Sequence, residues 1–167
     1  MKISTFVTVA YLVSVTASFA GVGDTREQCD GLYGQPSASY EKAQLERPSM
    51  FPGGAPLKME WKASLVCVYA PTPTCQVVAW FIPAGEKMIC NAIYCRSYNQ
   101  AENLQAKYLT VPAPAIKWSE DPGNRQSSWE LLSKGFTRSD GKVVASYNER
   151  AIDGLKLREL IIFSPAP

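Results

Sequence analysis

Three strand-like segments joined by short turns constrain the fold of this chain more than any other feature of its sequence. The first, residues 57–69, opens with alternating apolar and charged side chains, and residues 75–82 (CQVVAWFI) and 87–95 (KMICNAIYC) follow as apolar runs. Alternation and short apolar runs of this kind are typical of strands. Because connections this short join antiparallel neighbours, the sequence predicts an antiparallel meander.

The C-terminal part of the chain repeats this pattern. Residues 129–138, 142–148 and 155–163 are predicted strands, and the dipeptides Asp140-Gly141 and Asp153-Gly154 lie between them. Asp-Gly is typical of the two-residue type I′ turn, in which both residues take positive φ. A second antiparallel meander is therefore expected here.

A short helix is predicted before each meander. Thr25 and Gln28 have the spacing of a capping box, and Gly34 and Pro36 are typical of a helix end. Between them Cys29, Leu32 and Tyr33 form one apolar stripe, which predicts a buried face. Residues 97–109 contain helix formers without Gly or Pro and predict the second helix.

These elements predict an α+β fold with two helix-plus-three-strand units, residues 24–96 and 97–164, in an antiparallel sheet with helices packed on one face. The two units are similar in length but share little residue identity, so a duplication is a hypothesis. Residues 37–56, which contain prolines and a Gly-Gly pair, predict an irregular connection.

The first twenty residues are typical of an export signal. Lys2 precedes an apolar stretch, and Ser18 and Ala20 fit cleavage between Ala20 and Gly21. The apolar stretch is shorter than the ~20 residues of a membrane span. Residues 21–167 are then expected to form one domain without a membrane span, located in the periplasm or secreted. The chain contains no Asn-x-Ser/Thr sequon, so no glycosylation site indicates a eukaryotic secretory protein.

Composition excludes several functions. The chain has no His, so catalytic sites and metal sites that need an imidazole are ruled out. The formal net charge is +2 and the charges are dispersed, unlike a nucleic-acid-binding surface. Ser139 and Lys142 match the Ser-x-x-Lys pattern, but a predicted hairpin turn separates them instead of a helical turn. We therefore expect no catalytic residue, cofactor or metal.

Five cysteines lie at positions 29, 67, 75, 90 and 95. In an oxidising compartment the expected strand registers favour a disulfide between Cys67 and Cys75 or between Cys75 and Cys95. Cys90 and Cys95 would point to opposite faces of one strand and so would not bond. The alternative is that all five are small buried apolar residues, and Cys29 is expected in the core.

The opening helix resembles that of small exported bacterial domains. Residues 23–28 (GDTREQ) and 33–36 (YGQP) carry the likeness to outer-membrane assembly lipoproteins of the SmpA/BamE type and to β-lactamase-inhibitor-like domains. Exported proteins of unknown function with a Thr-Arg-x-x-Cys…Tyr-Gly-x-Pro opening are similar too, and have a later strand pair like residues 139–147. The resemblance implies a non-catalytic binding domain. The lipoproteins carry a lipidated Cys after their signal, which this chain lacks, and their domains are shorter.

The resulting hypothesis is a non-catalytic binding or structural domain of the cell envelope, whose partner is an envelope protein. The alternatives are an envelope hydrolase using Ser or carboxylate residues, and a secreted enzyme inhibitor. The sequence indicates neither the oligomeric state nor the identity of a partner.

Overall fold

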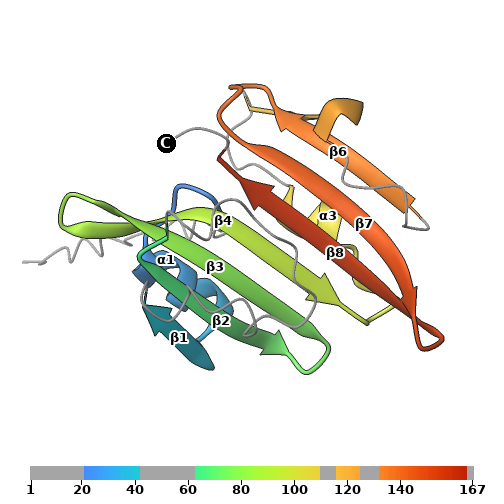
Figure 1. Ribbon diagram of the computed structural model, residues 1–167, viewed down its shortest axis with the longest axis horizontal. Coiled ribbons are helices and arrows are strands. Elements are labelled where there is room, and N and C mark those ends of the chain that lie inside the picture. Colours follow the sequence, from blue (N-terminus) through green and yellow to red (C-terminus); the bar gives the residue numbers. More distant parts are fainter. Residues whose placement is uncertain (1–20, 42–62, 110–115, 125–131, 165–167) are drawn as a thin grey trace, which may run out of the picture.

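The computed structural model describes residues 21–41, 63–109, 116–124 and 132–164. These residues form one antiparallel sheet of eight strands in the order β1-β2-β3-β4-β8-β7-β6-β5 (Figure 1). The strands are β1 (Ala38–Glu41), β2 (Leu65–Thr72), β3 (Cys75–Ala84), β4 (Lys87–Ser97), β5 (Trp118–Glu120), β6 (Leu132–Arg138), β7 (Val144–Ile152) and β8 (Leu155–Phe163). The helices are α1 (Arg26–Tyr33), α3 (Leu104–Tyr108) and the 3-10 turn η3 (Pro122–Asn124).

The sheet order is symmetric about its centre. Each half contains a helix, a short edge strand and a three-strand meander, and the last strands of the two halves, β4 and β8, pair with each other. Their register runs from Ala92 opposite Phe163 to Ser97 opposite Arg158. The two meanders therefore share one continuous sheet. The duplication itself stays a prediction, because equal topology does not establish common descent.

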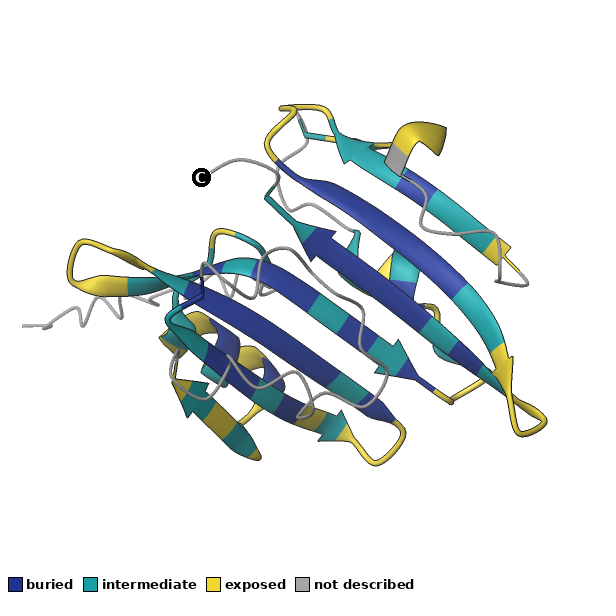
Figure 2. Ribbon diagram, in the orientation of Figure 1, coloured by how far each residue is buried: buried dark blue, intermediate teal, exposed yellow. Residues whose placement is uncertain are grey.

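The main core lies on the face of the sheet that carries both helices. From α1 it includes Cys29 and Tyr33, from α3 Leu104, and from β4 and β8 residues such as Ile93 and Leu160. All five are buried. Figure 2 shows that burial is concentrated in the central strands, while the hairpin ends are exposed. Apolar burial along these strands is what stabilises the sheet.

A smaller apolar cluster lies on the opposite face. It contains Val66, Val78, Trp80 and Ala92, with Ala63 just before β2. Because side chains alternate along a strand, β2 and β3 contribute to both clusters. The central strands are thus buried on both sides.

Local signals explain where α1 begins and ends. The Thr25 hydroxyl accepts from the backbone N–H of Gln28 at 3.3 Å, and the Gln28 side chain accepts from the N–H of Thr25 at 2.7 Å. This is the predicted capping box, which satisfies N–H groups that have no partner inside the helix. Gly34 follows the helix with φ 85°, a conformation that favours glycine.

The predicted α+β class is wrong: strands dominate the described chain, and its two α-helices have only eight and five residues. The second helix is shorter than the predicted 97–109, because β4 continues to Ser97 and Asn103 caps α3. Leu32 on the predicted buried stripe is 42% exposed. Two edge strands, β1 and β5, were not predicted.

Further predictions concern the turn after β6 and residues outside the part of the chain that the structure describes. The connection after β6 spans residues 139–143, so Asp140-Gly141 does not form a two-residue turn. The expected strand at residues 57–62 and the first part of the one at 129–138 lie outside the described residues, as does the export signal with its cleavage site between Ala20 and Gly21.

Candidate functional site

The β7–β8 hairpin projects beyond the rest of the sheet. Neighbouring β6 last pairs with β7 at Glu149, and β4 last pairs with β8 at Arg158. Beyond these positions, the only pairing among the described residues is between β7 and β8 themselves, ending with Ile152 opposite Leu155. Figure 1 shows this loop extending past the neighbouring strands at the lower right. No other described strand therefore flanks the end of this hairpin.

The end of this hairpin carries two exposed apolar side chains. Ile152 is 37% exposed and Leu155 is 56% exposed. As directly paired residues they lie on the same face of the ribbon. Between them Asp153 has φ 50° and Gly154 has φ 78°, as expected for a type I′ turn. We call residues 152–155 the β7–β8 tip.

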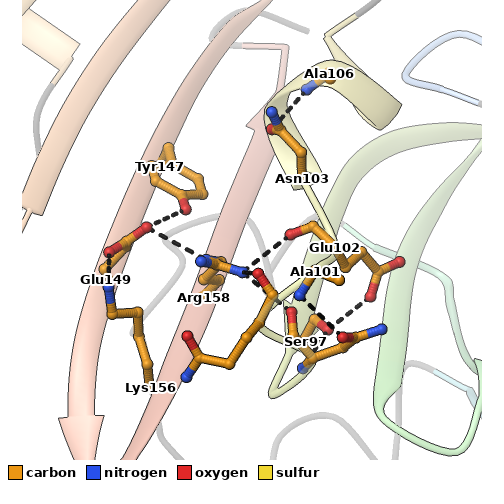
Figure 3. A network of polar contacts seen from close by, with 11 residues as sticks. Ser97, Ala101, Glu102, Asn103, Ala106, Tyr147, Glu149, Lys156 and Arg158 are labelled. Carbon is orange, nitrogen blue, oxygen red and sulfur yellow. Dashed lines mark hydrogen bonds and ion pairs between the residues drawn. The ribbon is translucent and has the colours of Figure 1, made fainter.

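A polar cluster fixes the base of the hairpin on the helix-bearing face (Figure 3). The Glu149 carboxylate accepts from the Tyr147 hydroxyl at 2.7 Å and from the Arg158 Nε at 3.3 Å, and lies 3.2 Å from the Lys156 Nζ. Burial alone would raise the pKa of Glu149, but these three donors outweigh it and lower the pKa. Glu149 is thus held as a carboxylate that bridges β7 and β8.

A second ion pair fixes the hairpin base on the opposite face. Glu159 is only 5% exposed, and its carboxylate lies 2.5 Å from the Arg150 Nη2. The Tyr94 hydroxyl on β4 donates to the same carboxylate. Burial, followed by the charge and hydrogen bond of Glu159, raises the pKa of Tyr94, so this hydroxyl stays protonated. The hairpin is clamped to the sheet on both of its faces.

Arg158 also holds the connection between β4 and α3. Its Nη1 donates to the backbone carbonyls of Asn99, Gln100 and Glu102 at 3.1, 2.6 and 3.2 Å. This connection and the hairpin base border an open pocket of about 310 Å³. Its lining is mostly polar and includes Tyr147 and Glu149.

Two carboxylates border this pocket, the arrangement that a carboxylate-dependent hydrolase would require. The Glu102 side chain accepts from the Ser97 hydroxyl at 2.6 Å and from the Lys107 Nζ at 2.8 Å. Burial would raise the pKa of Glu102, but its bonds to Lys107 and Ser97 lower it. Both Glu102 and Glu149 are therefore ionised and engaged by cations, so neither is suited to act as a general acid. The cluster has the chemistry of a structural ion-pair network.

The Ser-x-x-Lys match also lacks a catalytic geometry. Ser139 lies in the loop after β6, where its Oγ accepts from the backbone N–H of Lys117 at 3.1 Å. The Lys142 backbone N–H donates to Asp140 at 3.0 Å, which closes the loop. The Ser139 hydroxyl thus links the segment just before β5 to the loop between β6 and β7.

The five cysteines are all buried free thiols, and no two sulfur atoms lie at disulfide distance. The register places Cys67 opposite Ala79 and Cys75 opposite Ser97, so the expected proximity of Cys67 to Cys75 is not found. Cys75 and Cys95 are diagonal neighbours on the same face, since Cys95 lies opposite Val77. This geometry gives no support to the bonds Cys67–Cys75 or Cys75–Cys95.

The exposed tip was not identified as a site from the sequence. The Asp153-Gly154 turn was predicted correctly, but Ile152 and Leu155 have the alternation of core residues. The signal that could have found them is their position directly beside a two-residue turn, where neighbouring strands are least expected to reach.

No helix among the described residues is long and apolar enough to cross a membrane. In comparisons with known proteins, no family model, no curated protein and no solved structure matches the chain.

Proposed function

We propose that this protein is a non-catalytic binding domain of the cell envelope, and that it contacts a protein partner through the β7–β8 tip. The observation that carries this proposal is the pair of exposed apolar side chains, Ile152 and Leu155, on a hairpin that extends beyond its neighbours. Envelope location rests on the export signal expected in residues 1–20.

The energetics of the tip favour a protein partner. Complete burial of a large aliphatic side chain contributes roughly 1.5–3 kcal/mol. Because Ile152 is 37% and Leu155 56% exposed, covering them supplies a part of this to a specific contact. A few such side chains commonly dominate an interface. The complementary surface is an apolar pocket wide enough to receive a hairpin end.

The rigid base lowers the cost of binding. The ion pairs Glu149–Arg158 and Arg150–Glu159 hold β7 and β8 together on opposite faces. The type I′ turn further restricts the backbone at Asp153 and Gly154. A segment that is already ordered loses less conformational entropy when it binds, so more of the burial energy is available for affinity.

The test compares the purified protein with an Ile152→Ser/Leu155→Ser double variant. Each is immobilised and exposed to the envelope fraction of the source cell, and retained proteins are identified by mass spectrometry. We expect one partner to be retained by the wild type and lost by at least 10-fold in the double variant. An Ala84→Ser/Lys87→Ser variant, altered at the exposed β3–β4 end, is the matched control and should retain it. Equal retention by all three proteins would contradict the proposal.

A secreted enzyme inhibitor is the second candidate, because a narrow two-residue turn is suited to entering a cleft. An inhibitor differs from a plain binding domain in two ways: its partner is an enzyme, and binding lowers that enzyme's activity. Adding the protein to the purified partner separates the two: a plain binding domain leaves any enzymatic rate unchanged, and an inhibitor lowers it in proportion to occupancy.

A further inference from the structure

Backbone hydrogen bonds fix the start of α1 directly beside Cys90 of β4. The Gly23 N–H donates to the Cys90 carbonyl at 2.8 Å, and the Cys90 N–H donates to the Asp24 carbonyl at 2.8 Å. Thr25 forms an antiparallel bridge with Ile89. The segment that leads into α1 therefore pairs with β4 as a short additional strand would.

Cys29 lies one helical turn beyond this anchor. Its backbone N–H donates to the Thr25 carbonyl at 3.1 Å, so one hydrogen-bonded turn separates it from the residue that bridges to Ile89 of β4. Cys29 and Cys90 belong to the same core cluster and are 0% and 1% exposed. Burial, followed by the interaction with the Cys29 thiol, raises the pKa of Cys90. The Cys90 thiol donates to the Ala92 carbonyl at 3.3 Å.

We propose that Cys29 and Cys90 are the disulfide-forming pair of this chain, and that their bond cross-links α1 to the sheet. Each thiol loses one proton and one electron as the Sγ–Sγ bond forms. A disulfide oxidant, such as oxidised glutathione, accepts the two electrons and two protons and leaves as two thiols. The proposal does not depend on the β7–β8 tip or on any partner.

The other three cysteines have different neighbours. Cys67 contacts the Ser39 hydroxyl at 3.5 Å, and Cys75 contacts the Tyr108 hydroxyl at 3.9 Å. Cys95 lies opposite Val77, and Cys75 is its diagonal neighbour on β3 but not at disulfide distance. With Cys29 and Cys90 bonded, the other three cysteines remain buried thiols, which agrees with the odd number of cysteines.

The order of events follows from burial. The attacking species in disulfide exchange is the thiolate, and the raised pKa of Cys90 disfavours it once α1 is docked. Oxidation is therefore expected while the chain folds and slowly, if at all, in the reduced folded protein.

The test is to refold the full chain in a glutathione redox buffer, denature and alkylate it without reductant, and map the linkages by proteolysis and mass spectrometry. We expect three alkylated cysteines and a cross-linked peptide pair containing Cys29 and Cys90. Five alkylated cysteines, or a bond that involves Cys67, Cys75 or Cys95, would overturn the proposal.

Variants give an independent readout. Reductant should lower the Tm of the wild type and of Cys67→Ala, the matched buried control, but not that of Cys29→Ala or Cys90→Ala. A reductant-dependent shift in Cys29→Ala equal to that of the wild type would overturn the proposal as well. If either variant fails to fold, the linkage map of the wild type decides alone.

Discussion

The β3–β4 and β7–β8 hairpins occupy equivalent places in the two halves of the sheet, yet they present different surfaces. Both project beyond their neighbours, at opposite ends of the molecule (Figure 1). At the β3–β4 end the last pair is Ala84 with Lys87, both exposed, and the larger Ile82 and Ile89 are half-buried. At the β7–β8 end the two aliphatic side chains form the last pair.

The hairpin bases differ as well. The β7–β8 base is fixed by ion pairs on both faces, centred on Glu149 and Glu159. Beside the β3–β4 hairpin the chain buries thiols and aromatic rings, including Cys90 and Phe81. Topology thus places a hairpin at each end of the sheet, whereas the side chains of the two ends differ, and it is this difference on which the proposed binding by the β7–β8 tip rests.

The largest predicted effect tests whether the two halves unfold together. Phe81 in the first half and Leu160 in the second are both fully buried in one core cluster. We expect Phe81→Ala to cost about 3–5 kcal/mol and Leu160→Ala about 2–5 kcal/mol of the free energy of unfolding. Chemical denaturation followed by fluorescence and circular dichroism should show one coincident transition for each variant. Two separate transitions would show that the halves are independent units.

The next effect concerns the ion pair at the hairpin base. Arg150→Met leaves the nearly buried Glu159 without its cationic partner, and we expect a loss of about 1.5–3 kcal/mol, typical of a hydrogen bond to a charged group. Lys134→Met removes an exposed ion pair with Glu120 and should cost at most about 1 kcal/mol. Denaturant titration measures both. Equal losses would contradict a clamping role for Arg150.

The decrease in unfolding free energy at acid pH should depend on the second half of the sheet, through Glu149 of β7. The pKa of Glu149 is lowered from 4.5, so its contribution is complete above that value and is lost as pH falls through the lower, folded-state pKa. Glu149→Gln should therefore flatten the decrease in unfolding free energy between neutral and acid pH, at a cost of about 1 kcal/mol at pH 7. Lys156→Met should show a smaller change in the same direction. An unchanged acid limb in Glu149→Gln would refute this assignment.

The decrease in unfolding free energy at alkaline pH should depend instead on groups in the first half of the sheet, such as the Cys95 thiol. Burial raises the pKa of this thiol well above 9.0, so the folded state keeps the proton that the unfolded chain releases. Its stabilising contribution is complete below about 9.0 and decreases as pH rises further. Under reducing conditions Cys95→Ala should flatten the alkaline decrease in unfolding free energy. A slope equal to that of the wild type would contradict this.

The smallest effect on stability is expected at the tip itself. Ile152→Ser and Leu155→Ser alter exposed side chains and should each change the unfolding free energy by less than about 0.5 kcal/mol. Thermal denaturation of the two variants checks this. A loss comparable to that of Arg150→Met would mean that the tip stabilises the fold and would weaken its assignment to binding.

The strands could be predicted because alternation and short turns are local properties, and the capping box of α1 is encoded within four residues. The edge strands β1 and β5 are too short to show a period. The second helix was predicted too long because residues 97–103 have favourable helix propensity, yet pairing of Ser97 with Arg158 extends β4. Tertiary pairing overrides propensity in such cases.

The site could not be predicted, because it depends on register. Ile152 and Leu155 have a core-like pattern, and only the ends of β4 and β6 show that neither of these described strands reaches them. The pairing of the segment before α1 with Cys90 of β4 likewise joins residues far apart in sequence. The register expected for Cys67–Cys75 was wrong because the β2–β3 turn follows Thr72. The register expected for Cys75–Cys95 was wrong because the β3–β4 turn follows Ala84 and Cys75 lies opposite Ser97.

The central claim, that the β7–β8 tip and not the β3–β4 end contacts the partner, is tested most directly by site-specific photo-crosslinking. A benzophenone amino acid is placed at Leu155 in one protein and at Lys87 in another, both exposed positions in the last pair of their hairpins. With the envelope fraction, we predict a crosslinked partner from position 155 that is absent from position 87. The same partner crosslinked from both positions, or from position 87 alone, would contradict the account.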